Sequence, residues 1–433
     1  MCDTHVLKKD NVVFFAKNSD REPDEAQLVV RIPSVENDTT RKLKTTYIEI
    51  DQSPNRHSVL LSKPFWIWGA EMGANDRGVV IGNEAVYTSL IDKTPGLIGM
   101  DLLRLGLERG DTAEHAMHVI IELLHKHGQG GVCGFRDKHM RYDNSFIIAD
   151  SDQAWILETA GRHWVAKKVK TFGAISNCLT IGEDYDLKSD SLEDIAKKKG
   201  FFSGKGEFNF KKTFDTRFIP YFAASRHRLA SGNHCLQETS HDEHAHVQQM
   251  MYNLRTHYEQ GSSPATGTNR DLCMHAGGFI RRSQTCGSMV SRLGKTVNAH
   301  FFTGTSAPCL SIFKPATFDL DIKCCVLNPD EKTVDGSIWQ KNEHIHRRII
   351  FMDEERQELQ ESIAHTENEM LLLFEQSDFQ VSDKDFKIAD GIINNWLKLW
   401  YEKYRNQAIY YPSMSMYGRF WRKTNEVDGL LNR

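Results

Sequence analysis

The chain has 433 residues, of which 40% are hydrophobic and 26% charged, and this composition is ordinary for a folded globular protein. Its formal net charge of -4 argues against a protein that binds the phosphate backbone of nucleic acids. No apolar run reaches the roughly 18 residues of a membrane span, and residues 8–11 are polar where a signal peptide would be apolar. The nine cysteines, an odd number in a long chain, favour reduced thiols over disulfides. We therefore expect a cytoplasmic protein.

The chain begins with a cysteine directly behind the initiator methionine. Methionine aminopeptidases remove Met1 when the next side chain is small, and Cys2 is small. Removal would leave one residue with both a thiol and a free α-amine, whose reference pKa is about 8. The thiolate is a nucleophile and the amine can serve as its base, which is the N-terminal-nucleophile arrangement. Without further evidence, a cysteine at position 2 is more often a residue without catalytic function.

A short hairpin is predicted at the N-terminus. Residues 12–15 are β-branched and aromatic, and Asp10 and Asn11 before them form a turn signal. The second strand of this hairpin would bring residues 17–21, a polar cluster, next to Cys2. The plain alternative is that this cluster is the solvated end of the hairpin.

The next part of the chain alternates strand and helix patterns. Two amphipathic helices are expected at residues 97–109 and from residue 113 until Gly128, each with one apolar face that should cover a sheet. A capping box is expected at the start of the second helix. Three consecutive strands should form an antiparallel meander, followed by a fourth strand at 173–177. Strands are predicted at 27–32, 47–51, 59–62, 78–83, 145–150, 154–159 and 163–169.

The C-terminal part reads differently. A helix is expected at 241–256, strands at 300–303 and 310–318, and long helices at 343–374 and 385–411. The side chains of Trp396, Leu399, Trp400 and Tyr404 fall on one helical face. Strands first, helices in blocks and antiparallel connections predict an α+β fold. We divide the chain into residues 2–335, the main domain, and residues 336–433, a helical C-terminal extension.

Several sequence blocks together resemble one known family. They include CDTHV, FFAKNSDREPDEAQ, FWIWGAEMGANDRGVVIGNEAV, AWILETAGRHW, CMHAGG, SQTCGSMVS and HFFTGTSAPCLSIFKP. In this order and spacing they resemble the secernin family, within peptidase family C69 of cysteine N-terminal-nucleophile hydrolases. The resemblance runs from residue 2 to about residue 315 and is weaker in the last hundred residues. It implies the four-layer αββα sandwich of N-terminal-nucleophile hydrolases.

The resemblance also suggests roles for polar residues near strand ends. Asn83 and Asn177 each end an apolar strand, and an amide NH2 donates to developing negative charge without titrating, so both are candidates for the oxyanion hole. Asp20 is expected to hold the N-terminal ammonium or a substrate amine. Lys17 is assigned to substrate binding; it stands where related amidases have arginine, so it keeps the charge but not the fork of donors. Arg21 is a candidate for binding a substrate carboxylate.

The stretch from Cys273 to Gly278 offers a second kind of chemistry. Cys273 and His275 are two residues apart and can face one side of a strand, but a metal site would need two more ligands. His241, His244 and His246 are available, yet the chain has no CxxC or HExxH motif. We therefore expect no metal and no cofactor, and assign His275 to substrate binding. His5 and His275 are the alternative bases should the amine of Cys2 not act.

The expected activity is hydrolysis of amide or peptide bonds, as in a dipeptidase, by attack of the Cys2 thiolate. Substrates would be small peptides or N-acyl amino acids. The alternative is a regulatory protein of exocytosis on the same fold, since the secernin family is also linked to exocytosis and fold does not determine function. Partners from the vesicle machinery and a homo-oligomer are then conceivable, whereas nucleic acid and a membrane span are not expected.

Overall fold

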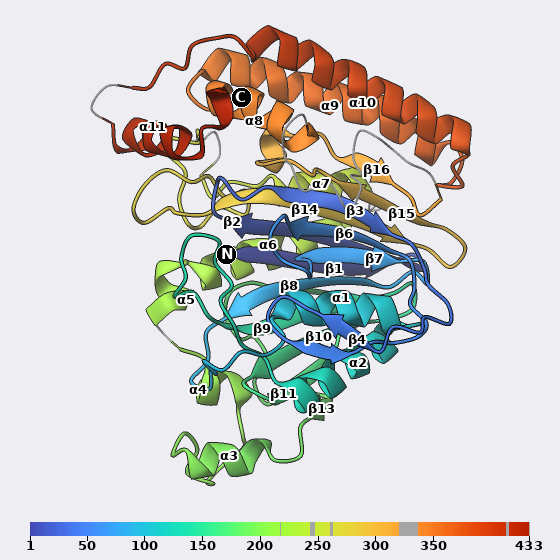
Figure 1. The fold of residues 1–433 in the computed structure, drawn as a ribbon, viewed down its shortest axis with the longest axis vertical. Coiled ribbons are helices and arrows are strands. Elements are labelled where there is room, and N and C mark those ends of the chain that lie inside the picture. The colour runs from blue at the N-terminus through green and yellow to red at the C-terminus, as the bar shows by residue number, and fades with distance from the viewer. Residues whose placement is uncertain (217, 243–246, 260–262, 320–336, 413–414, 433) are drawn as a thin grey trace.

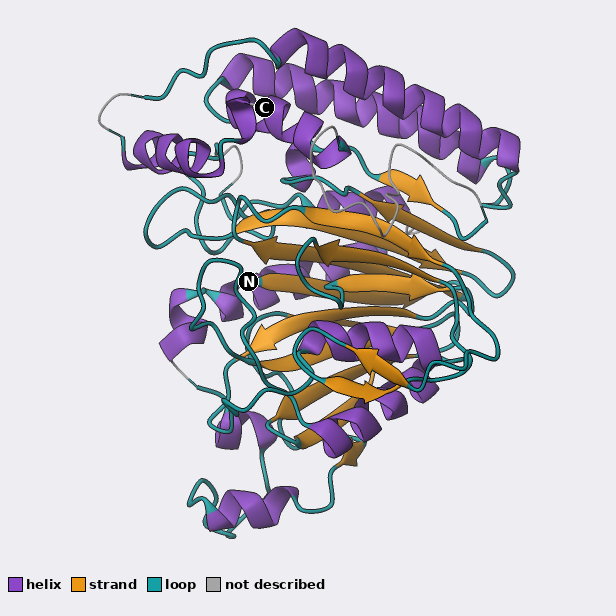
Figure 2. Ribbon diagram, viewed as in Figure 1, coloured by secondary structure: helices purple, strands orange, loops and turns teal. Residues whose placement is uncertain are grey.

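The computed structural model describes the chain except residues 217, 243–246, 260–262, 320–336, 413–414 and 433. Two large antiparallel sheets face each other, and helices cover the outer side of each sheet (Figure 1). Further helices from the C-terminal part pack at one end of this sandwich (Figure 2). The expected α+β fold, a four-layer αββα sandwich with C-terminal helices, is therefore confirmed.

The first sheet is built around the N-terminal hairpin. Asp10 and Asn11 adopt left-handed backbone conformations with φ of 51° and 62°, which suits a tight hairpin turn between β1 and β2. The register places Cys2 opposite Ser19, so the polar end of β2 lies beside the chain terminus as predicted. The strand order in this sheet is β12 (Phe172–Ile175), β1 (Cys2–Lys9), β2 (Val12–Arg21), β14 (Gln284–Leu293), β15 (Asn298–Phe302) and β16 (Lys314–Ala316).

The second sheet has eight strands and contains the predicted meander. Its order is β13 (Leu187–Lys188), β11 (His163–Lys168), β10 (Ala154–Ala160), β9 (Asp143–Ala149), β8 (Val80–Val86), β7 (Met72–Asn75), β6 (Val59–Pro64) and β3 (Gln27–Ile32). The strand after the meander, β12, leaves this sheet and pairs with β1. That crossing brings Asn177, just beyond β12, close to Cys2.

Two pairs of helices form the outer layers. Helices α1 (Gly99–Arg109) and α2 (Ala113–His127) pack on the second sheet through buried leucines and isoleucines. The Thr112 side chain accepts from the His115 N–H, and α2 ends at Gly128. Helices α6 (Ser225–His241) and α7 (Val247–Leu254) cover the first sheet. Helix α6 was not predicted because its buried face includes Arg228 and Gly232 rather than a stripe of apolar residues.

The C-terminal helices share the main hydrophobic core with the two sheets. The predicted helix at 343–374 is two helices, α8 (Ile338–Ile349) and α9 (Asp353–Glu375), and the last predicted helix is α10 (Asp383–Tyr404), followed by α11 (Met416–Asp428). The predicted apolar face of α10 needs one correction, since Leu399 is 66% exposed and Leu397 is buried instead.

The remaining elements are short. They are β4 (Lys42–Lys44), β5 (Glu49–Asp51), α3 (Leu192–Lys198), α4 (Phe210–Phe214), α5 (Phe218–Phe222), η1 (Pro308–Leu310) and η2 (Leu430–Asn432). The predicted strand at 310–318 is reduced to β16 because η1 occupies its start. No helix in the described part of the chain is long and apolar enough to cross a membrane. The seven cysteines that the structure describes are free thiols.

Candidate active site

A cavity of about 250 Å³ opens at the N-terminal end of β1, where the two sheets meet. Cys2 lines it together with Asp20 and Arg21 at the end of β2. Glu71, directly before β7, and Ala85 of β8 also line it, and α5 contributes exposed apolar side chains at the rim. The cavity therefore holds the chain terminus together with Asp20 and Arg21, two of the five residues of the polar cluster at 17–21.

The thiol of Cys2 is buried at this cavity. Its sulfur lies 4.0 Å from Oε2 of Glu71. Burial raises the pKa of the thiol to about 11; Lys17 and the Met1 amine lower it, while Glu71 and Asp20 raise it further. In a chain that still carries Met1, the thiol is therefore protonated at neutral pH and a poor nucleophile.

The backbone nitrogen of Cys2 is held by Asn177. Its N–H donates to Oδ1 of Asn177 at 2.9 Å, and the Nδ2 group of Asn177 donates to the carbonyl oxygen of Ala85 at 2.9 Å. Removal of Met1 would turn this nitrogen into the α-amine of Cys2 without changing its place on β1. Asn177 thus contacts Cys2 through its Oδ1 and positions the nitrogen, while its predicted role as a donor to the oxyanion stays a prediction.

Asp20 lies beside the terminus and has a free oxygen. The Met1 amine donates to the backbone oxygen of Asp20 at 2.8 Å, and the Asp20 N–H donates to the Met1 oxygen at 2.8 Å. In the side chain, Oδ1 accepts from the Thr285 hydroxyl at 2.6 Å, whereas Oδ2 is buried without a partner among the described residues. Burial raises the pKa of Asp20 to about 6, and the Met1 amine opposes this. A substrate or terminal ammonium would satisfy this oxygen.

Lys17 lies between the sheets and not on the cavity wall, so its placement does not support the predicted role in substrate binding. Its Nζ donates to Oε1 of Glu84 at 3.0 Å, and both side chains are fully buried. Burial lowers the pKa of Lys17, but Cys2, Glu84 and Glu71 raise it above its ordinary value. Lys17 is therefore a permanent positive charge near the sulfur, which favours the thiolate.

Three other predicted residues have different surroundings. Arg21 lines the cavity, but its guanidinium donates to Glu71 and Glu25 at 2.6 Å each, so its charge is balanced within the protein. Asn83 lies off the cavity wall and donates to Asn144 Oδ1 at 3.2 Å. His275 also lies outside the cavity, in the segment before β14. The roles assigned to these three residues stay predictions that their placement does not support.

Two residues of the site were missed by the sequence analysis. Glu71 faces the sulfur, and Arg228 of α6 donates to the carbonyl oxygen of Cys2 at 3.1 Å and to Oδ1 of Asn177 at 2.8 Å. Both belong to segments without a chemical motif, and only the fold brings them to the terminus. The sequence signal that could have pointed to Glu71 is its place in FWIWGAEMGANDRGVVIGNEAV, a block that resembles the secernin family.

His5 is excluded as the base by strand geometry. Side chains alternate along a strand, so the side chains of Cys2 and Thr4 lie on one face of β1 and the side chain of His5 lies on the opposite face. Thr4 bonds to Glu84 of the facing sheet, whereas His5 lies against Gly232 of α6. Burial also lowers the pKa of His5 to about 4.

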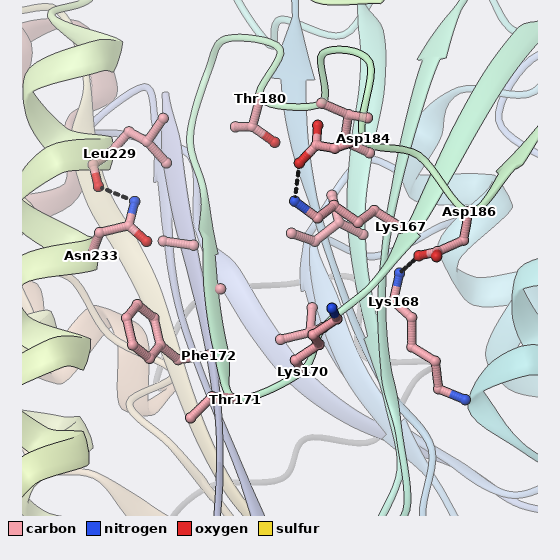
Figure 3. Close-up of a pocket in the computed structure, with 15 residues that line it drawn as sticks. Lys167, Lys168, Lys170, Thr171, Phe172, Thr180, Asp184, Asp186, Leu229 and Asn233 are labelled. Carbon is pink, nitrogen blue, oxygen red and sulfur yellow. Dashed lines mark hydrogen bonds and ion pairs between the residues drawn. The ribbon is translucent and has the colours of Figure 1, made fainter.

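A second, larger cavity of about 560 Å³ lies between β11, β12 and α6 (Figure 3). Three lysines line it, and Lys167 pairs with Asp184 while the Lys168 N–H donates to Asp186 (Figure 3). None of the predicted site residues lines this cavity. The chemistry expected from the sequence is therefore assigned to the smaller cavity.

Comparison with known proteins gives both a sequence family and loose structural likenesses. The solved structures include penicillin V acylase from Agrobacterium tumefaciens, with 12% identity over 73% of this chain and 85% of that chain and a TM-score of 0.42. A C2A mutant of conjugated bile acid hydrolase from Clostridium perfringens has 11% identity over 70% and 88% of the chains, with a TM-score of 0.40. A Caenorhabditis elegans ortholog of N-acylethanolamine-hydrolyzing acid amidase has 11% identity over 67% and 92%, with a TM-score of 0.34.

The sequence match covers the segment between the N-terminal strands and α6. The family model described as peptidase family C69 matches residues 69–226. This segment holds Glu71 and Asn177 of the cavity, while Cys2 and Asp20 precede it. Over residues 69–226, the chain carries the sequence pattern of peptidase family C69.

Proposed function

We propose that this protein is a cysteine N-terminal-nucleophile hydrolase of amide bonds, a dipeptidase-like member of the secernin family that acts after removal of Met1. The observation that carries the proposal is the surroundings of Cys2. Its nitrogen bonds to Asn177, its carbonyl oxygen bonds to Arg228, and its sulfur faces the cavity beside Glu71. A cysteine with only a packing role would not need its nitrogen, oxygen and sulfur each placed by a separate polar group.

In the proposed reaction the α-amine of Cys2 takes the thiol proton. The thiolate attacks the substrate carbonyl carbon, the resulting ammonium gives its proton to the leaving amine, and an acyl-thioester remains on Cys2. A water molecule, deprotonated by the same amine, then releases the acid. Lys17 and Arg228 stabilise negative charge around the sulfur, and Asn177 keeps the amine in place.

The charge of the cavity supports a substrate with a free amine. Five carboxylates line it against two guanidinium groups. The unpartnered oxygen of Asp20 lies among them and would accept an ammonium group. The exposed side chains of Ile219, Phe222 and Ile280 at the rim suit an apolar substrate side chain. A short peptide with a free N-terminus fits this surface better than an N-acyl amino acid.

The test combines a mass measurement with turnover. We expect the mature protein to begin with Cys2 and to hydrolyse members of a dipeptide panel. Cys2→Ala should lower the rate of hydrolysis by about 10³-fold or more, as expected for loss of a nucleophile. N-acylated versions of the best dipeptide are the control for the amine preference. Two results would favour the regulatory protein of exocytosis instead. In the first, a protein that begins with Cys2 hydrolyses no dipeptide. In the second, Cys2→Ala hydrolyses dipeptides as fast as the parent protein.

A further inference from the structure

A compact group of two cysteines and two histidines lies outside the active-site cavity. His257 follows α7, Cys273 and His275 lie before β14, and Cys309 is in η1. One ligand atom from each lies within 4.8 Å of all the others. Three of the side chains are buried, and His257 is half-buried. The four residues come from three segments of the chain, so only the fold assembles them. Cys273 and His275 are the pair that the sequence offered, but their partners are His257 and Cys309. Of the histidines that the sequence suggested as partners, His244 and His246 lie outside the described residues.

The distances fit tetrahedral coordination. Nε2 of His275 lies 3.1 Å from Nε2 of His257, 3.7 Å from the Cys273 sulfur and 3.3 Å from the Cys309 sulfur. A zinc ion with ordinary bond lengths would separate two nitrogens by about 3.3 Å and a nitrogen from a sulfur by about 3.6 Å. The three distances from His275 are thus close to the spacings that a tetrahedral zinc ion requires, and all four ligand atoms lie within 4.8 Å of one another.

The surrounding contacts hold the three segments in place. The N–H groups of Leu272 and Cys273 both donate to the Thr256 oxygen at 3.1 Å, which ties the second segment to the first. Arg255 donates to the carbonyl oxygens of Pro308 and Ser311, on either side of Cys309. The ligands are thus fixed by backbone contacts that do not involve their own side chains, as in preorganised metal sites.

We propose that His257, Cys273, His275 and Cys309 bind one zinc ion in a closed structural site. Two thiolates and two imidazoles are a ligand set that selects zinc over hard cations. Four protein ligands leave no open position for water or substrate, so the site stabilises the fold and does not catalyse.

The site has one connection to the cavity of Cys2. Met274, between two of the ligands, donates its N–H to the Thr285 hydroxyl at 2.8 Å, and that hydroxyl donates to Asp20. The zinc ion would therefore fix the segment that orients Asp20. This connection adds a consequence, but the zinc proposal does not depend on the proposed hydrolysis.

The test is metal analysis of the full-length protein, purified under reducing conditions with a tag that contains no histidine. We expect equimolar zinc by elemental analysis, and after exchange to cobalt the visible bands of a tetrahedral ion together with a thiolate charge-transfer band. Cys273→Ser and Cys309→Ser should each lower zinc affinity by at least tenfold. The matched control is Cys235→Ser, since Cys235 is near Thr256 but outside the group, and it should keep full zinc content.

The wild-type protein decides the question even if the serine variants do not fold. Zinc should protect Cys273 and Cys309 from alkylation, and a strong chelator should remove this protection. Three results would overturn the proposal: a folded, reduced protein that takes up no zinc against a competing chelator, a Cys273–Cys309 disulfide in the intact mass, or a cobalt spectrum without thiolate charge transfer.

Discussion

Arg228 donates to the carbonyl oxygen of Cys2 at 3.1 Å, and the same guanidinium pairs with Oδ2 of Asp3 at 2.5 Å. Both charged side chains are buried. A third bond reaches Oδ1 of Asn177 at 2.8 Å. Helix α6, strand β1 and the segment after β12 are therefore joined at one buried ion pair, directly beside the residue proposed to react.

Replacing Arg228 should destabilise the protein strongly. Arg228→Gln leaves Asp3 as a buried carboxylate without its counter-charge, which costs about 3–5 kcal/mol when one partner of a buried pair is removed. Urea denaturation gives the free energy of unfolding. The control is His234→Gln, an exposed position on the same helix, which should cost less than about 1 kcal/mol. Equal stability of Arg228→Gln and the parent protein would show that this pair contributes nothing.

Alkylation of Cys2 should depend steeply on pH as long as its nitrogen is a peptide amide. Because burial raises the thiol pKa to about 11, the thiolate fraction at neutral pH is small and grows about tenfold per pH unit. A chain with Ala inserted between Met1 and Cys2 provides this form. The iodoacetamide rate at Cys2, followed by peptide mass spectrometry, should still rise between about pH 7 and about pH 9. A plateau near pH 8 would mean that Lys17 outweighs burial.

The sequence predicted the elements whose signals are local. The hairpin follows from Asp10 and Asn11, which tolerate positive φ, and α1 and α2 follow from apolar residues at helical spacing. Cys2 as the nucleophile and Asn177 as a donor to the oxyanion were also singled out from the sequence. These features depend on neighbouring residues or on the order of the sequence blocks.

What the sequence did not predict depends on contacts between distant segments. Helix α6 has a buried face with Arg228 and Gly232, and such a face has no amphipathic signature. Asn83 follows an apolar run as Asn177 does, but its amide contacts Asn144 rather than the cavity, and the sequence alone gives no side-chain direction. The four-residue Cys/His group was incomplete in the sequence because His257 and Cys309 are 52 residues apart and share no motif.

An aspartate in place of Asn177 should shift the pH dependence of hydrolysis. In the mature protein a carboxylate at this position would lie against the α-amine of Cys2 and favour its charged form, so the amine pKa rises. The neutral amine is the active base, and the ascending limb of kcat/KM should therefore move to higher pH by about one unit or more. The melting temperature, measured in parallel, separates this effect from loss of structure. An unchanged pH profile in a folded Asn177→Asp protein would remove Asn177 from contact with the amine.

The C-terminal extension should contribute to the stability of the main domain through Glu367 of α9. Its Oε1 accepts from the Phe313 N–H at 2.8 Å and from Arg255 at 2.6 Å, and Oε2 accepts from Arg255 at 2.8 Å. Glu367→Ala leaves Arg255 without its counter-charge, so we expect a loss of about 3–5 kcal/mol in the free energy of unfolding. Glu369→Ala, an exposed position on the same helix, is the control. Equal stability of the two variants would mean that the extension is attached only loosely.

The decisive variant for the proposed chemistry is the insertion of Ala between Met1 and Cys2. Pairing of β1 with β2 fixes Cys2 in its place, so the inserted Ala occupies the position of Met1 after processing. The sulfur, Asn177 and Arg228 keep their contacts, but the nitrogen of Cys2 becomes an amide without a basic lone pair, as in the structure described here. We expect this insertion to abolish hydrolysis nearly as fully as Cys2→Ala.

Cys2→Ser separates the base from the nucleophile. This variant keeps the free amine and should retain a weak rate, since a hydroxyl is a poorer nucleophile than a thiol. The chain with the inserted Ala keeps the thiol but should have no measurable rate of hydrolysis. Comparison of the two variants therefore assigns the lost activity to the amine. The mass of the inserted protein must show that it begins with Ala. If that protein hydrolyses substrate at the parent rate, the base is another group. His5 faces α6 and cannot take this role. The carboxylate of Glu71, 4.0 Å from the sulfur, is then the residue to replace next.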